Sequence, residues 1–294
     1  MFKKRSIALA VTIALMITLL APMPVMAASG GGPLVKNVKQ YNYNTTNKKW
    51  EISNKRQYTY NKAYPAQIDF TSYSSETKSP YKYKYKMKKN KPKSAKEINP
   101  LGKKATSLKY NKKGLRTKSS YNNYFKRQGE TRTYKYNKNG FATSQTYKYK
   151  YKYSNGTKYV SDSSTDYYTY NYSMSKGLPK RMICTYAYNY GSGRQESSTR
   201  TEVKYNKKGL ITSISYLYSD GTVSSSYKVS YKTKKGKIAS ATIYYTDYDG
   251  KKTPRTKISF GYTKTKVAKA RYANMINSFI ANATTARAGA YNWY

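Results

Sequence analysis

Histidine is absent from this chain of 294 residues, and only one cysteine, Cys184, is present. Without histidine the chain cannot build a Ser-His-Asp triad, a Cys-His pair or a histidine zinc site. With one cysteine it cannot form an internal disulfide, and the apolar-leaning run Met182-Ile183-Cys184 indicates a small buried residue. These catalytic and structural sites are therefore excluded.

Acidic residues are scarce, with 12 Asp and Glu against 57 Lys and Arg, which gives a formal net charge of +45. The pairs Asp162/Asp166 and Asp247/Asp249 lie in or beside turn-like segments, where aspartate is common, so they do not indicate a carboxylate pair. A hard cation needs several convergent oxygens, which this charge disfavours. No glycine-rich phosphate loop is recognisable. We therefore expect no enzyme, no metal and no cofactor.

Long apolar runs are missing after the first residues. A basic start at residues 3–5, the apolar run Ile7–Leu20 and the small residues Val25 and Ala27 predict a signal peptide over 1–27. No later stretch is long enough to span a bilayer as a helix. We expect a secreted or extracellular protein, and the leader, the excess of Lys over Arg and the lack of a lipoprotein cysteine favour a Gram-positive producer.

Tyrosine replaces the scarce aliphatic residues, with 38 copies in the chain. Over 81–88 and 147–153 tyrosine alternates with lysine, so an extended strand places all tyrosines on one face and all lysines on the other. The tyrosine face is either a buried core or a binding platform. The lysines are candidate contacts for an anionic polymer: Lys82, Lys84, Lys86, Lys148, Lys150 and Lys152.

A turn motif recurs at 110–115, 136–141 and 205–210, where Tyr-Asn is followed by Gly and then Leu or Phe. Asparagine at the start of a turn bonds to backbone further along, and glycine adopts the left-handed conformation that closes a bulged hairpin. The predicted turn residues are Asn111, Gly114, Asn137, Gly140, Asn206 and Gly209.

The pattern predicts a mostly β protein, an extended antiparallel meander of repeated hairpins with about 10–14 strands and one C-terminal amphipathic helix packed on the sheet. The apolar residues Ala268, Tyr272, Met275, Ile276, Phe279, Ile280 and Ala283 follow helical spacing, with Thr265 and Gly289 as candidate ends. The expected segments are a flexible start 28–40, the β-repeat domain 41–264 with an irregular loop 88–104, the helix 265–289 and a tail 290–294.

The repeated Tyr-Asn-Lys-x-Gly-Leu unit, followed by an alternating strand, resembles the tyrosine-aspartate repeats of the RHS family, in which Tyr-Asp precedes the turn glycine. The resemblance covers residues 105–262 and implies a hairpin-repeat architecture. Asparagine stands here in place of the aspartate, and the chain is too short for a shell that encloses a toxin. The resemblance therefore predicts the repeat architecture without that activity.

Three hypotheses about function follow from these features. The first is a secreted, non-catalytic protein that associates with an anionic polymer such as cell wall, teichoic acid, polysaccharide or DNA, without specific nucleic-acid recognition. The second is a matrix protein that self-associates through strand edges. The third is a carrier in which sheet and helix enclose a cavity for an apolar ligand.

Overall fold

The computed structural model describes residues 31–284, except for 74–77, 99–103, 124–127, 155–158, 190–192 and residue 248. The expected signal peptide 1–27 and the tail 290–294 lie outside the described residues. The elements are β1 (Gly32–Asn44), β2 (Lys49–Asn61), β3 (Tyr64–Tyr73), β4 (Lys78–Lys88), β5 (Lys91–Ile98), β6 (Lys104–Tyr110), β7 (Arg116–Asn123), β8 (Gln128–Tyr136), β9 (Ala142–Ser154), β10 (Tyr159–Ser175), β11 (Leu178–Asn189), β12 (Arg194–Tyr205), β13 (Ile211–Leu217), β14 (Val223–Lys234), β15 (Lys237–Thr246), β16 (Lys252–Val267) and α2 (Lys269–Ala283).

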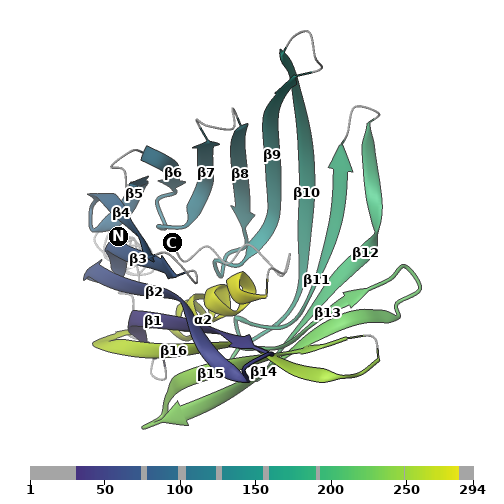
Figure 1. Ribbon diagram of the computed structural model, residues 1–294. Coiled ribbons are helices and arrows are strands. Elements are labelled where there is room, and N and C mark those ends of the chain that lie inside the picture. The colour runs from purple at the N-terminus through teal and green to yellow at the C-terminus, as the bar shows by residue number, and fades with distance from the viewer. Residues whose placement is uncertain are drawn as a thin grey trace, which may run out of the picture.

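The strands form a closed barrel in sequence order (Figure 1). Each strand pairs antiparallel with its neighbours along the chain, and β1 closes the ring by pairing with β16 from Gly32↔Val267 to Asn42↔Thr256. The prediction of an antiparallel meander with a C-terminal helix is confirmed. An open meander of fewer strands is wrong, because pairing of the first and last strands satisfies the backbone groups that two open edges leave unpaired.

The two faces of the barrel wall differ in chemistry. Along β4 the lysines are exposed and the tyrosines between them are partly buried. The tyrosine side chains of the alternating strands therefore face the barrel interior. Aliphatic residues of other strands complete the core there. Fully buried aliphatic residues are Leu34, Ile68, Ile211, Ile214, Ile243 and Ile258.

Two segments expected to be irregular are strands. The flexible start predicted for 28–40 is wrong from Gly32 onward, since β1 carries the buried Leu34 and Val35. The loop predicted over 88–104 contains β5, in which Pro92 and Ala95 face inward. These short side chains lack the aromatic alternation of β4, and a shift of register between Lys86 and Met87 interrupts the period.

The C-terminal helix is shorter than predicted. It runs over Lys269–Ala283 rather than 265–289, because β16 stays paired with β1 as far as Val267. Thr265 lies in β16 and does not cap the helix, whose N-cap Ala268 makes no side-chain bond. Gly289 lies outside the described residues. Within the part of the chain that the structure describes, no helix is long and apolar enough to cross a membrane.

The Tyr-Asn motif builds tight hairpin turns at one end of the barrel. In the turn after β12, Asn206 and Leu210 are joined by a backbone bond of 2.9 Å, and Gly209 has φ of +72°. The Asn206 side-chain oxygen accepts the backbone N–H groups of Lys208 and Leu210 at 2.9 and 3.2 Å. The turns at Asn111 to Gly114 and Asn137 to Gly140 repeat these bonds.

Helix α2 lies within the ring of strands and is fixed to these turns (Figure 1). Arg271 donates to the carbonyl oxygen of Ala63 in the β2–β3 turn. Asn274 donates to Gly140 and Asn277 to Gly209, at 3.0 and 2.8 Å. Because these turns belong to hairpins spread around the barrel, the helix bridges across this end.

Candidate functional site

A cavity of about 300 Å³ opens on the inner wall of the barrel, beside strands β2 to β8. Aliphatic and aromatic side chains form much of its lining, and charged side chains from three strands reach it. The lining residues are Arg56, Ile68, Phe70, Tyr83, Thr106, Leu108, Arg116, Ser119, Ser120, Tyr121, Glu130, Arg132 and Tyr134.

Strand register explains why charged residues face inward here. Arg132 lies opposite Ser119 of β7 on one side and Tyr147 of β9 on the other. Ser119 in turn pairs with the buried Leu108. Residues that pair directly across antiparallel strands share one face of the sheet. Arg132 is therefore held on the core face, at a position where its side chain is 46% exposed.

Each of the three cavity arginines stacks on an aromatic ring. The guanidinium carbon of Arg56 lies 5.1 Å from the Phe70 ring centre, and that of Arg116 lies 5.1 Å from Tyr134. For Arg132 the partner ring is Tyr147, at 4.8 Å. Stacking of this kind stabilises a cation and fixes the plane of the guanidinium group.

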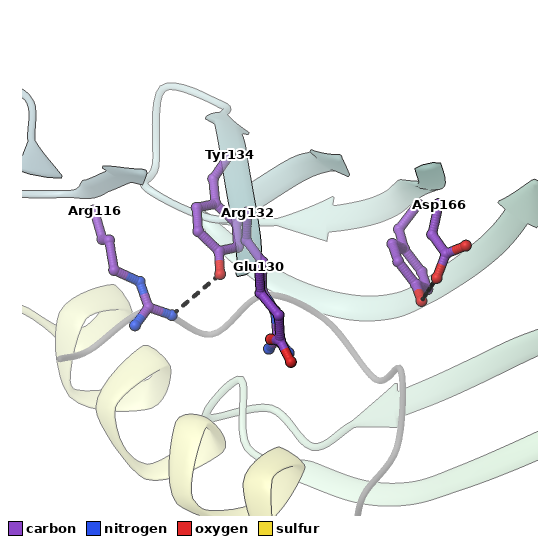
Figure 2. A network of polar contacts seen from close by, with 6 residues as sticks. Arg116, Glu130, Arg132, Tyr134 and Asp166 are labelled. Atoms are coloured by element: carbon purple, nitrogen blue, oxygen red, sulfur yellow. Dashed lines mark hydrogen bonds and ion pairs between the residues drawn. The ribbon is translucent and has the colours of Figure 1, made fainter. Parts of the chain in front are cut away.

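The acids near the cavity are fewer than the arginines. Glu130 pairs with Arg132 at 3.3 Å (Figure 2). Glu97, on β5, accepts a bond from the Thr106 hydroxyl and lies next to Tyr83. Burial, followed by the negative charge of Glu97, raises the pKa of Tyr83 well above its usual value. The cavity thus retains an excess of positive charge.

A second polar cluster lies on the inner face of β10 and β11. The Asp166 carboxylate accepts the hydroxyls of Tyr168 and Tyr186 at 3.4 and 3.1 Å. The Tyr168 and Tyr186 rings are 5.2 Å apart. Figure 2 shows Asp166 away from the Arg116–Tyr134 pair, toward another part of the wall. Asp166 therefore belongs to a tyrosine network and not to the cavity.

A smaller space of about 280 Å³ lies between helix α2 and the turns. Its wall includes Tyr85 and Tyr110, whose rings are 5.9 Å apart and whose hydroxyl oxygens are buried without a hydrogen bond of regular geometry. Burial is the main reason that the pKa of each hydroxyl is raised. These tyrosines remain neutral at physiological pH.

The predicted lysine contacts lie on the outer face of the barrel wall and do not line this cavity. Lys82, Lys84 and Lys86 are exposed on β4, and Lys148 and Lys150 are exposed on β9. Four strands separate these two groups, so they do not form one surface. Lys152 belongs to β9, but its side chain lies outside the described residues.

The interpretation of the chain as a binder of anionic polymer, including the cell wall, is wrong. It assumed a sheet with one free lysine face, whereas the lysines are distributed around a closed wall that holds a helix inside. The matrix alternative assumed free strand edges, whereas β1 pairs with β16 and closes the sheet formed by the described strands. A barrel with a helix inside fits the carrier hypothesis.

The cavity arginines were missed as candidate residues, although part of their signal is in the sequence. Glu130 and Arg132 have the same parity as Tyr134 and Tyr136, so alternation places them on the tyrosine face. Arg56 likewise precedes Tyr58 and Tyr60. Arg116 gives no such signal, since a register shift next to Tyr110 changes the parity of β7.

No protein-family model matches the sequence, and no curated protein is significantly similar to it. Among solved structures, a porin-like protein from Bacteroides uniformis ATCC 8492 superposes with a TM-score of 0.50 at 10% identity, over 80% of this chain and 99% of that one. A porin-like protein from Bacteroides vulgatus ATCC 8482 gives 0.42 at 10% identity, over 79% and 100%. The first likeness supports the closed barrel fold.

These findings correct one expectation. The resemblance to RHS repeats is wrong, because the hairpins close into one barrel that is similar in fold to a porin-like protein. The extracellular location and the Gram-positive producer stay predictions from the sequence, because a likeness at 10% identity shows the fold alone. Each segment interpreted from the sequence as a repeat unit belongs to the hairpins of the barrel wall.

Proposed function

We propose that the chain is a non-catalytic carrier that binds a small molecule with an apolar body inside its barrel, outside the cytoplasm. The observation that carries this proposal is the cavity of about 300 Å³ between Arg56, Ile68 and Leu108. Small-molecule sites span about 300–1,000 Å³ and combine an apolar lining with a few polar groups. The lining described above has this composition.

Closure of one barrel end by helix α2 supports a carrier. Asn277 is fully buried and bonds to both Gly209 and Ile211, so the helix is firmly attached across the opening. A channel needs passage from end to end, whereas a carrier needs one entrance. We expect the ligand to enter from the end opposite the helix.

The lysines on the outer face of the wall favour a barrel that is surrounded by water rather than by lipid. Lys84 and Lys86 on β4, and Lys148 and Lys150 on β9, are exposed on the outside. Each lysine facing the middle of a bilayer costs about 2–4 kcal/mol. The likeness to a porin-like protein is therefore taken as a likeness of fold, and the tyrosine-lined interior as the place where an apolar ligand binds.

The test is a fluorescence titration with N-phenylnaphthylamine, a neutral apolar probe, on the mature chain. We expect saturable binding with one site per chain. Ser119 lines the cavity, so Ser119→Trp fills part of it and should weaken binding at least tenfold. The matched control is Ser215→Trp, since Ser215 pairs with Glu202 on the other face of β13.

Two results contradict the proposal. One is a lack of probe binding by the folded wild-type chain. The other is an equal affinity of wild type and Ser119→Trp, which places the probe elsewhere on the molecule. Circular dichroism of both tryptophan variants shows whether each has retained the barrel.

A further inference from the structure

We propose that the ligand of this cavity is a small amphipathic anion, whose carboxylate or similar acidic group binds to Arg116 and Arg132. This inference rests on the carrier function and specifies its ligand. It starts from the cations in the lining, which are Arg56, Arg116 and Arg132, with Glu130 as the acid among the lining residues. The lining therefore contains more cationic than acidic side chains.

The partial burial of Arg116 favours a ligand that carries the opposite charge. The Arg116 guanidinium lies 5.1 Å from the centre of the Tyr134 ring and donates a hydrogen bond of 3.4 Å to the Tyr134 hydroxyl (Figure 2). A guanidinium in a partly desolvated site gains most from a charged acceptor, because charge-assisted bonds are shorter and stronger than bonds to neutral groups. An anion that enters the cavity supplies such an acceptor.

The fact that the cations are arginines narrows the range of acidic groups that the ligand can carry. The cavity lining contains arginines and no lysine, although lysine dominates the chain as a whole. Because one face of each guanidinium lies against an aromatic ring, its N–H donors point along the plane of the group. Planar donors match the two oxygens of a carboxylate, which arginine can bind in bidentate fashion.

The remaining wall accommodates the apolar part of such a ligand. Ile68 and Leu108 are buried at 2% exposure each and lie in the same lining, next to Phe70. Glu130 and Arg132 are 29% and 46% exposed, so the charged side of the cavity is the side that water reaches. The ligand therefore places its apolar body inward and its acidic group toward this charged side.

The experiment compares two probes that differ in one acidic group. N-phenylnaphthylamine is neutral, and anilinonaphthalene sulfonate is the same skeleton with a sulfonate. Titrations are performed in about 1 M salt, where the Debye length of about 3 Å screens the outer lysines. Wild type is expected to bind the sulfonate at least tenfold more tightly than the neutral probe.

Substitutions inside and outside the cavity test whether the preference for the sulfonate probe comes from the cavity arginines. Arg132→Gln should lower the ratio of sulfonate affinity to neutral-probe affinity at least tenfold. Arg200→Gln removes the same charge from the exposed outer side of β12 and should change neither affinity. Glu130→Gln removes the acid that competes for Arg132 and should strengthen sulfonate binding severalfold, which gives a second test if Arg132→Gln does not fold.

The outcomes separate this inference from the proposed function. Failure of both probes to bind contradicts the carrier itself. Equal affinities for the two probes in wild type contradict only the anion preference. An equal loss of sulfonate binding in Arg132→Gln and Arg200→Gln, or weaker sulfonate binding in Glu130→Gln, also overturns it, because the effect then comes from overall charge.

Discussion

Asn277 in helix α2 and Gly209 in the β12–β13 turn are joined by a hydrogen bond of 2.8 Å from the side-chain amide to the backbone carbonyl. The side-chain oxygen of the same asparagine accepts the backbone N–H of Ile211 at 2.9 Å. One fully buried amide thus satisfies two backbone groups of a motif turn. The helix that closes the barrel end is fixed by this pairing in addition to its apolar face.

Asn277→Ala should therefore lower the free energy of unfolding by roughly 2–4 kcal/mol, since two buried backbone groups lose their partner. Asn274→Ala is the matched control, because Asn274 is partly buried and its side chain donates to the single carbonyl of Gly140. We expect about 1 kcal/mol for the control. Urea unfolding of both variants measures the difference, and equal losses contradict the special role of Asn277.

Two turn glycines offer a test of side-chain packing at the end of the barrel to which helix α2 is bound. Gly209 and Gly236 have φ of +72° and +71°, so alanine at either position costs about 1–2 kcal/mol in the left-handed region. A Cβ at Gly209 also lies 3.2 Å from Leu178, whereas at Gly236 it meets nothing within 4 Å. Gly209→Ala should therefore be the more destabilising variant, by about 1 kcal/mol. Comparison of their unfolding midpoints checks the order.

Alkaline pH should destabilise the barrel. Burial raises the pKa of Tyr85, Tyr110, Tyr170 and Tyr231 above the value of about 10 for an unfolded tyrosine. Above that pH the unfolded chain binds fewer protons than the folded one, so the stability present at lower pH decreases as pH rises. Unfolding free energies measured across the alkaline range should show this decline.

Tyr110→Phe provides the corresponding variant. The Tyr110 hydroxyl is buried without a hydrogen bond of regular geometry, so its removal should cost little at neutral pH or even stabilise the chain. The decline in stability above pH of about 10 should also become shallower, because one group with a raised pKa is gone. An unchanged alkaline profile shows that Tyr110 titrates normally in the folded chain.

The outer lysines should contribute little to folding and ligand binding. Lys84→Gln and Lys86→Gln change exposed side chains on the outside of β4, so each should alter the unfolding free energy by less than about 0.5 kcal/mol. Affinity for N-phenylnaphthylamine should be unchanged. A large loss of stability in either variant implies that these lysines have structural contacts beyond those of a solvated wall.

Local features of the fold were accessible from the sequence because they depend on near neighbours. The alternation around Tyr83 and Lys84 predicts a strand with two chemically different faces, and the turn at Asn206 and Gly209 forms through bonds within five residues. Strand β5 was missed because Pro92 and Ala95 lack the aromatic signal. This strand forms because it pairs with β4, whose own sequence alternates regularly between tyrosine and lysine.

The candidate site was less accessible, since it is built by residues from several strands. Parity along the chain places Arg56 and Arg132 on the tyrosine face, but parity does not bring them to one cavity. Register does so, because it sets which residues lie opposite each other across six strands. The inward position of Arg116 depends on a register shift next to Tyr110, which no local sequence pattern predicts.

The sequence by itself determined most of the strands, the motif turns, the two faces of the wall and the presence of a C-terminal helix. These follow from side-chain periodicity and from turn residues that act over a few positions. Only the tertiary structure decided that β1 pairs with β16, with Gly32 opposite Val267. That contact joins residues far apart in the chain, and its formation depends on the summed twist and register of all the intervening strands. The same closure turned a lysine-rich sheet into the outer wall of a barrel with an arginine-lined cavity inside.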